Sequence, residues 1–198
     1  MQDPKTTYSR YRVWFKKYAM ARFIGHLDLQ SFFAKAIKRA KLPVAYSGGF
    51  NPHQLLSIAV PLSLGIPGSR EALEFYLVEH LGASDVKDRL NQQMPDGIEI
   101  LEVEIVPSIG KAAAALVHSA RYLIYFENDG LDMEEAFNQV MKNEDISSRV
   151  FELKMAKENV IEATIATGSA KNLKPQLLIE HLGLDLKKVR YERAEIIL

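Results

Sequence analysis

The chain has 198 residues, with 25 basic and 25 acidic side chains and a formal net charge of zero. Hydrophobic residues make up 47% of it, which is enough to bury a core and excludes a disordered protein. It has no cysteine, which excludes disulfides, thiolate zinc sites, cysteine nucleophiles and an iron–sulfur cluster bound by this chain. No apolar run reaches the ~18 residues of a membrane span. The start of the chain lacks the apolar stretch of a signal peptide, so we expect a cytoplasmic protein with no membrane partner.

The charges are unevenly spread along the chain. Residues 1–55 carry ten basic and two acidic side chains, a balance of plus eight. Residues 71–106 carry nine acidic and two basic side chains, a balance of minus seven. The basic segment either forms a positive face that attracts an anionic partner, or is neutralised across the fold by the acidic segment. The sequence leaves both interpretations open.

The first half predicts the order strand, helix, strand, strand, helix, strand. Aromatic and β-branched residues favour the strands, and apolar residues spaced three and four apart favour an amphipathic helix that Pro43 ends. Residues 61–70, with two prolines and two glycines, are expected to form a loop, and Ser84 is the expected N-cap of the second helix. The expected elements are strand 11–19, helix 27–42, strand 55–60, strand 72–79, helix 84–94 and strand 98–106.

Proline, glycine and four consecutive alanines then interrupt the pattern, and we place a linker at 107–118. The second half repeats the order of elements, which is that of the ferredoxin-like, or split βαβ, motif. We therefore predict an α+β protein of two tandem ferredoxin-like (βαββαβ) domains with antiparallel sheets, at 8–106 and 119–198. The expected elements of the second domain are strand 120–127, helix 132–143, a hairpin over 149–166 that turns near Glu158-Asn159, helix 172–183 and strand 189–198.

Side-chain patterns give two further expectations for the second half. Ala136, Phe137, Val140 and Met141 are expected to face inward on its first helix. Pro175 stands in the first turn of its second helix, and Gly183 follows the end of that helix.

The stretch RFIGHLDL, at 22–29, stands where the first strand ends and the first helix begins. Asp28 is suited to cap that helix or to lie favourably at its positive end. His26 is expected at the same rim of the sheet, where it either meets a ligand or serves as a hydrogen-bonded structural residue.

The stretch YSGGFNPHQ, at 46–54, precedes an apolar strand. It combines two glycines, an aromatic residue, an Asn-Pro pair and a histidine, which is more than a plain turn requires. Its glycines permit positive φ, and Pro52 fixes its own φ and biases Asn51 to an extended conformation. We interpret it as a preorganised binding loop that presents Asn51 and His53 beside His26 and Asp28 in one pocket, although a glycine bulge that feeds an inner strand is the structural alternative. Such a set suits metal binding or acid–base chemistry, and the sequence does not decide whether a metal binds.

Two stretches are suited to bind anions. Backbone N–H groups at 47–50 can cradle a phosphate, and GSAKNLKP, at 168–175, leads into a helix start, although a capped helix with solvated lysines explains the latter equally well. The candidate RNA- or phosphate-binding residues are Arg22, Lys35, Lys38, Arg39, Lys171, Asn172 and Lys174.

The motifs FIGHLDL, LPVAYSGGFNPHQLLSIAVPLSLG and GSAKNLKPQLL together resemble the radical SAM-linked protein family, a bacterial domain of unassigned function. Its members stand alone beside a radical SAM protein or are fused to the carboxyl end of a cobalamin-binding one. Two positions depart from the family pattern, since Gln54 replaces a proline and Gly25 replaces a serine. Outside the loop 46–54, the matching residues include Leu27, Ser57, Ala59, Pro61, Leu62, Gly65 and Glu74. The binding residues that the resemblance favours are His26, Asp28, Tyr46, Ser47, Gly49, Phe50, Asn51 and His53.

The resemblance implies a companion of a radical SAM protein, in genomes where its gene often lies near those of a ribonuclease and ribosomal proteins. We therefore predict an accessory protein that binds or presents the partner's substrate, namely RNA such as tRNA or rRNA, and that holds no cofactor itself. The aromatic stacking signature of RRM domains is absent. One alternative is a metal-independent endoribonuclease of tandem ferredoxin-like type that uses His26 or His53, and another is a non-catalytic protein scaffold.

Overall fold

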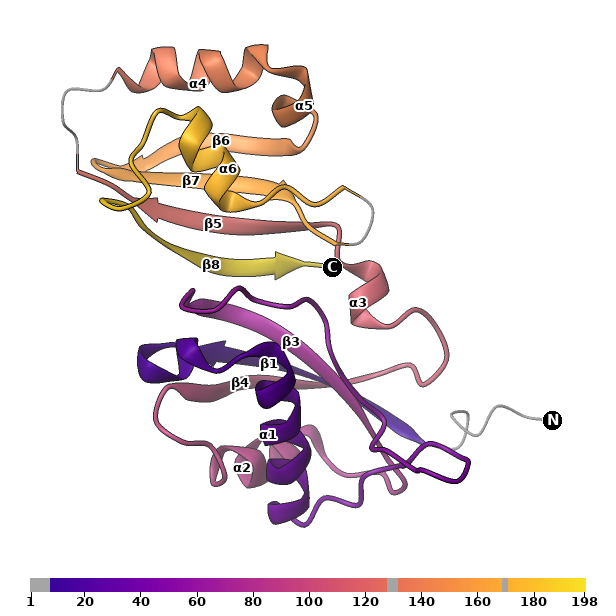
Figure 1. Ribbon diagram of the computed structural model, residues 1–198. Helices are drawn as coiled ribbons and strands as arrows, with labels where there is room; N and C mark the ends of the chain where they lie inside the picture. Colours follow the sequence, from indigo (N-terminus) through magenta and orange to yellow (C-terminus); the bar gives the residue numbers. More distant parts are fainter. Residues whose placement is uncertain (1–7, 128–131, 169–170) are drawn as a thin grey trace. The chain divides into compact units, whose positions relative to one another are not determined.

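The computed structural model describes residues 8–127, 132–168 and 171–198. The protein is a mixed α+β structure, as expected, and it divides into two compact units, Met1–Leu116 and Val117–Leu198. Figure 1 shows each unit as a sheet with helices packed against it. Within the described ranges, no helix is long and apolar enough to cross a membrane.

The strands of the first unit pair antiparallel in the order β4-β1-β3-β2. The β1–β3 register joins Tyr11 to Phe75 and Val13 to Leu73, and β4 pairs along the other side of β1. The elements of this unit are β1 (Ser9–Lys17), η2 (Ala19–Phe23), α1 (His26–Arg39), β2 (Leu56–Ile58), β3 (Gly68–Leu77), α2 (Ala83–Asn91), β4 (Ile98–Val106) and α3 (Ala113–Leu116).

The core of the first unit lies between one face of its sheet and the helices α1 and α2. Tyr11, Val13 and Phe15 alternate along β1 on this face, and all three are almost completely buried. The helix residues in the same core are Leu29, Phe33, Ile37, Val86 and Leu90. Since these positions are spaced four apart on each helix, one stripe of α1 is buried and the opposite stripe is left outward.

Two local predictions for the first unit are wrong. The expected loop 61–70 is too long, because β3 already begins at Gly68, where the chain pairs with Lys17 of β1. A Cβ atom at Gly68 would lie 2.6 Å from Oε1 of Glu71, so glycine leaves room for that side chain. The N-cap of α2 is Gly82, which makes no side-chain cap, and Ser84 lies inside the first turn.

A buried carboxylate ties the segment after β4 to this sheet. Glu74, 2% exposed, accepts hydrogen bonds from Arg10, from Arg12 Nε at 3.0 Å and from the backbone N–H of Ala113 at 3.0 Å. Arg10 also donates to the carbonyl of Lys111 at 2.9 Å. Residues 107–118, expected as a linker, therefore include a short helix. Hydrogen bonds at Lys111 and Ala113 fix this segment to β1 and β3.

The second unit repeats the pairing pattern, with the order β8-β5-β7-β6 and antiparallel pairs. The hairpin turn predicted near Glu158-Asn159 is confirmed, and Asn159 adopts a positive φ of 60° there. Gly183 follows α6 with a φ of 74°. The elements of this unit are β5 (Ser119–Tyr125), α4 (Met133–Lys142), α5 (Glu144–Ser147), β6 (Val150–Lys157), β7 (Val160–Ala166), α6 (Pro175–His181) and β8 (Arg190–Ile197).

The inward face of α4 is narrower than predicted. Ala136 and Val140 are buried and Phe137 is partly buried, but Met141 is 53% exposed. Each helical residue is turned about 100° from the one before it, so Met141 lies too far round the helix from Val140 to enter the core.

Candidate functional site

A ligand-sized groove lies on the first unit, between α1 and the loop 46–54. Its volume is about 500 Å³, within the range of roughly 300–1,000 Å³ of small-molecule sites. One wall is the outward stripe of α1, and the other is formed by the loop and the start of β2. The lining residues are Leu27, Gln30, Ser31, Ala34, Lys35, Lys38, Tyr46, Pro52, His53, Gln54 and Leu56.

The loop is closed by hydrogen bonds between Ser47 and His53. The N–H of Ser47 donates to the carbonyl of His53 at 2.8 Å, and the N–H of His53 donates to Ser47 Oγ at 3.0 Å. Ser47 Oγ also bonds Nδ1 of the His53 ring at 2.9 Å. Tyr46 and Gln54 form a β-bridge just outside this pair. The His53 side chain is therefore held at the edge of the groove.

The tip of the loop extends into solvent. Gly49 adopts a φ of 103°, a conformation that favours glycine, and the side chain of Phe50 is fully exposed. Asn51 and Pro52 are exposed as well. An aromatic side chain that contacts so little of its own chain is available for a partner.

The ionisable groups around the groove are basic or neutral. Lys38 Nζ lies 5.6 Å from the centre of the Tyr46 ring, a cation–π distance, and Lys35 stands one turn earlier on α1. Hydrogen bonding by the Gln54 amide and then by Lys38 holds the pKa of Tyr46 below its ordinary value, against a smaller opposing effect of burial. No aspartate or glutamate is among the residues that line the groove in the described part of the chain. Its electrostatic character favours an anionic ligand.

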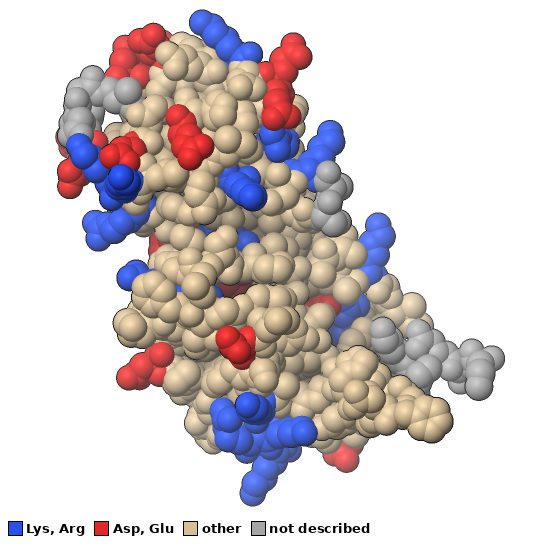
Figure 2. Space-filling model, in the orientation of Figure 1, with Lys and Arg blue, Asp and Glu red and all other residues tan. Residues whose placement is uncertain are grey.

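Basic side chains also gather around this wall. Figure 2 shows Lys and Arg side chains clustered over the part of the first unit where Figure 1 places α1 and α2. On α1 and just after it, the exposed basic residues are Lys35, Lys38, Arg39 and Lys41. Arg39 is partly engaged, since it donates to the carbonyl of Gln93 at 3.4 Å and lies 5.8 Å from the ring of Phe32.

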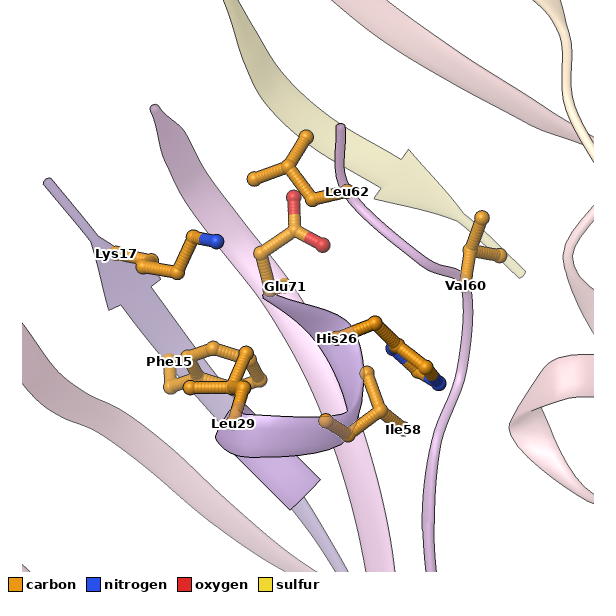
Figure 3. A pocket seen from close by; sticks show the side chains of 8 residues that line it. All are labelled: Phe15, Lys17, His26, Leu29, Ile58, Val60, Leu62 and Glu71. Atoms are coloured by element: carbon orange, nitrogen blue, oxygen red, sulfur yellow. The ribbon is translucent and has the colours of Figure 1, made fainter. Parts of the chain in front are cut away.

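A second, much smaller pocket adjoins the core beside the first turn of α1 (Figure 3). Its volume of about 10 Å³ is close to the space of one water molecule. Two of its side chains are charged and almost fully buried: Lys17, whose Nζ donates to the carbonyl of Ile24 at 3.0 Å, and Glu71. Figure 3 shows the Lys17 ammonium pointing toward the Glu71 carboxylate, with His26 on the other side of Glu71 beside Ile58 and Val60. This arrangement fills a polar gap in the core and leaves no room for an organic ligand.

The two histidines do not meet. His26 lines the small pocket and His53 lines the groove, so the predicted convergence of His26, Asp28, Asn51 and His53 is not observed. The reason is that His26 is the first residue of α1 and turns toward the core, whereas the loop lies along the outward stripe of the same helix. Asp28 is exposed and is not the N-cap of α1, which is Gly25. It lies in the first turn of the helix, where the helix dipole favours an acid. In the described ranges, no group of three or more His, Cys, Asp or Glu residues is placed to hold a metal ion.

The remaining predicted phosphate-binding residues lie elsewhere. Arg22 belongs to η2 and lies 4.9 Å from the ring of Phe23. Lys171, Asn172 and Lys174 belong to the second unit, where Lys174 is the N-cap of α6 and Asn172 accepts a hydrogen bond from Arg149 at 3.3 Å. Ser169, part of the same motif, lies outside the described residues.

Sequence reasoning missed several members of the groove. Gln30, Ser31 and Ala34 on α1 and Gln54 in the loop carry no chemistry that marks them as functional. The available signal was spacing: Leu27, Ser31, Lys35 and Lys38 recur at intervals of three and four, which puts them on one outward stripe. Nothing in that stripe indicates which loop packs against it.

One comparison with known proteins assigns the chain to a bacterial family. Residues 10–175 match the family described as "Uncharacterized protein conserved in bacteria (DUF2344)". The chain belongs to this family. No curated protein matches the chain.

Two solved structures are similar at low identity. One is described as an unknown protein from Galdieria sulphuraria, at 12% identity over 96% of this chain and 99% of that chain, with a TM-score of 0.30. The other is described as a "putative glycine cleavage system transcriptional repressor", at 10% identity over 94% of this chain and 98% of that chain, with a TM-score of 0.25. Scores this low inform neither the fold nor the function of the chain.

Proposed function

We propose that the protein is a cytoplasmic, RNA-binding companion of a radical SAM enzyme and that it holds the RNA on which the partner acts. The observation that carries the RNA part is the groove of about 500 Å³ lined by Lys35, Lys38, Tyr46 and His53. It combines cations for phosphate with an aromatic side chain for a base, and these are the two components of single-stranded nucleic-acid sites.

Charge supports RNA over a neutral or cationic ligand. The described residues that line the groove include no acid, and the neighbouring exposed side chains of α1 add Arg39 and Lys41. The fully exposed Phe50 at the tip of the adjacent loop offers a second aromatic surface. A chain of phosphates that passes such a wall releases counterions, which favours binding at low salt.

The partner is proposed from the resemblance of the loop and helix motifs to the radical SAM-linked family. The structure puts two of those motif residues, Ser47 and His53, in mutual hydrogen bonds at the groove. Because the chain has no cysteine, an iron–sulfur cluster of a radical SAM reaction must be bound by the partner.

We also propose that each unit is a ferredoxin-like fold and that the chain is a tandem of two. The support is the repeated order of strands, β4-β1-β3-β2 in the first unit and β8-β5-β7-β6 in the second, with the helices in corresponding chain positions.

Labelled tRNA and rRNA fragments test the RNA proposal directly. Retention of intact RNA on filters at low salt supports it, and absence of retention at low salt overturns it in favour of a scaffold. Shortened products would instead indicate the endoribonuclease, for which His53 beside Lys35 and Lys38 is the available acid–base group. Affinity purification from the native cell tests the partner, which must carry a cluster-binding set of cysteines.

A further inference from the structure

An exposed apolar surface lies on η2 and on the loop between β2 and β3. Met20, Phe23 and Leu64 are 76%, 50% and 64% exposed, so these large side chains contact little of their own chain. Met20 and Phe23 are three residues apart on a 3-10 helix, which places them on the same side of it. A Cβ atom at Gly65 would lie 3.5 Å from Phe23 Cε1, so the ring lies against the loop beside Leu64. Contiguous apolar side chains of this kind mark an interaction site.

Hydrogen bonds hold this surface in place. The N–H of Gly65 donates to the carbonyl of Arg22 at 2.9 Å, and Lys17 Nζ donates to the carbonyl of Ile24 at 3.0 Å. Ala19, which begins η2, adopts a φ of 46°, a left-handed conformation that is strained for a residue other than glycine and that concentrates at functional sites. Because the surface is already fixed, a partner that binds it orders little of the chain.

The one charged side chain of the surface, Arg22, has no acidic partner within the described chain. Its guanidinium carbon lies 4.9 Å from the centre of the Phe23 ring, a cation–π distance, and its side chain forms no ion pair or hydrogen bond with the described residues. Segments 18–24 and 59–67, which build the surface, contain no aspartate or glutamate. The planar guanidinium can therefore donate two parallel hydrogen bonds to a carboxylate from outside the chain.

The composition of the surface favours a protein over other large partners. Arginine, methionine and aromatic residues are enriched in protein–protein interfaces, and arginine and aromatic residues supply many of their strongest contacts. RNA and anionic membranes are bound by several cations together, whereas Arg22 is the only lysine or arginine in the two segments. A second copy of the chain is disfavoured, because a two-fold contact would bring Arg22 against a surface that has no acid.

We propose that Met20, Arg22, Phe23 and Leu64 form the docking surface for a protein partner that presents an aspartate or glutamate surrounded by apolar side chains. The carboxylate binds the Arg22 guanidinium, which the Phe23 ring holds in position, and the apolar side chains cover Met20 and Leu64. The inference requires no RNA and therefore goes beyond the proposed function, in which the radical SAM enzyme is the partner to be docked.

Cross-linking in the native cell tests the surface and shows the chemistry of its occupant. The photoreactive residue p-benzoylphenylalanine replaces Met20 in the full-length chain. In a matched control it replaces Phe151, an aromatic side chain of the second unit that is 60% exposed. Mass spectrometry should locate the cross-link from position 20 in a segment of another protein that has an acidic residue among apolar ones, and position 151 should not reach that segment.

Charge reversal then identifies the contact. Arg22→Glu should weaken binding of the purified cross-linked protein about thirtyfold, the loss expected for a well-placed interface arginine. Reversal of the partner's acidic residue to arginine should restore most of that loss. Arg190→Glu, an exposed position on β8, changes the net charge equally and should leave the affinity unchanged. Circular dichroism establishes that Arg22→Glu is folded, and Arg22→Gln, which removes only the charge, takes its place if it is not.

The other outcomes overturn the inference. A cross-link from position 20 to a second copy of the chain would show a homodimer contact, and a cross-link to RNA or lipid would show another class of partner. Cross-linking no stronger than that of the Phe151 control, or an unchanged affinity of Arg22→Glu, would show that nothing docks through this surface. Absence of RNA binding in the filter assay would overturn the proposed function and leave this inference standing.

Discussion

Ser47 and His53, six residues apart, close the loop over the groove with three hydrogen bonds, one of which joins Ser47 Oγ to the His53 ring at 2.9 Å. The serine hydroxyl thus fixes both the course of the backbone and the orientation of the imidazole. Pro52, the residue just before His53, has a fixed φ. The conformational freedom of the loop therefore lies at the glycines and Phe50 of its tip.

Replacing Ser47 with alanine should loosen the loop without unfolding the unit. The variant loses the acceptor for the His53 N–H and the contact with the ring, whereas the core residues of α1 and β3 are untouched. Hydrogen exchange of the amides in 46–54 should become roughly three- to tenfold faster, the effect of one ordinary hydrogen bond. Ser63→Ala, an exposed serine in the following loop, is the control. Unchanged exchange in Ser47→Ala would show that the hydrogen bonds do not hold the loop.

Replacing both Lys35 and Lys38 with alanine should flatten the dependence of RNA affinity on salt. Each phosphate contact that is removed lowers the slope of log affinity against log salt by about 0.7, the coefficient for single strands. Filter binding over a salt series measures this, and Lys142→Ala with Lys187→Ala, two exposed lysines of the second unit, is the matched control. An unaltered slope in the Lys35 and Lys38 variant would move the interface to Lys171 and Lys174. Arg39 is left in place, because its contacts with Gln93 and Phe32 give it a structural role.

Tyrosine titration should separate Tyr46 from two tyrosines of the second unit. The pKa of Tyr46 is lowered by Gln54 and Lys38, whereas burial raises the pKa of Tyr125 and of Tyr191. Ultraviolet difference spectra should therefore show the Tyr46 transition before those of Tyr125 and Tyr191, and it should be missing in Tyr46→Phe. Gln54→Met should shift that transition upward more than Lys38→Ala does, since the amide is the larger cause. A Tyr46 transition that coincides with those of Tyr125 and Tyr191 would contradict the local environment described above.

The same shifts give opposite contributions to stability at alkaline pH. A folded-state pKa below the unfolded value means that the native state binds fewer protons between these two pKa values. Tyr46 therefore stabilises the folded state increasingly as pH rises from its folded-state pKa to its unfolded-state pKa. For Tyr191 the folded-state pKa lies above the unfolded value, so its contribution is present below the unfolded value and is lost as pH rises through the folded one. Urea unfolding of Tyr191→Phe, compared with the native protein, should show a smaller loss of stability above about pH 10.

Replacing Glu74 with glutamine should destabilise the first unit strongly. The change leaves Arg10 buried without its carboxylate partner, and breaking a buried pair from one side costs about 3–5 kcal/mol of unfolding free energy. Urea unfolding measures the change, and Glu99→Gln, an exposed position on β4, should have an effect below about 0.5 kcal/mol. A loss for Glu74→Gln as small as for Glu99→Gln would show that the cluster with Arg10 and Arg12 does not stabilise the sheet.

Local patterns determined the elements of this protein. The spacing of Leu29, Phe33, Ala36 and Ile37 requires one buried stripe, and it predicts α1 because a helix is the structure that places these residues on one face. Alternation of Leu73, Phe75 and Leu77 likewise predicts β3 and the face that it turns to the core. The same reasoning failed at Glu74, which the alternation places on a solvent-facing side and which is buried between two arginines.

Only the tertiary structure decided which residues share a site. His26 and His53 stand at the two stretches with the most conspicuous chemistry, yet they line different pockets, whereas Gln54 lies against Ala34, 20 residues away, and completes the groove. Local sequence fixes which side of a helix is apolar, but it does not fix which distant loop covers the other side. That choice depends on strand register and on long-range hydrogen bonds, such as those of Ala45 with Tyr76 and Leu55, which draw the loop along α1 and β3.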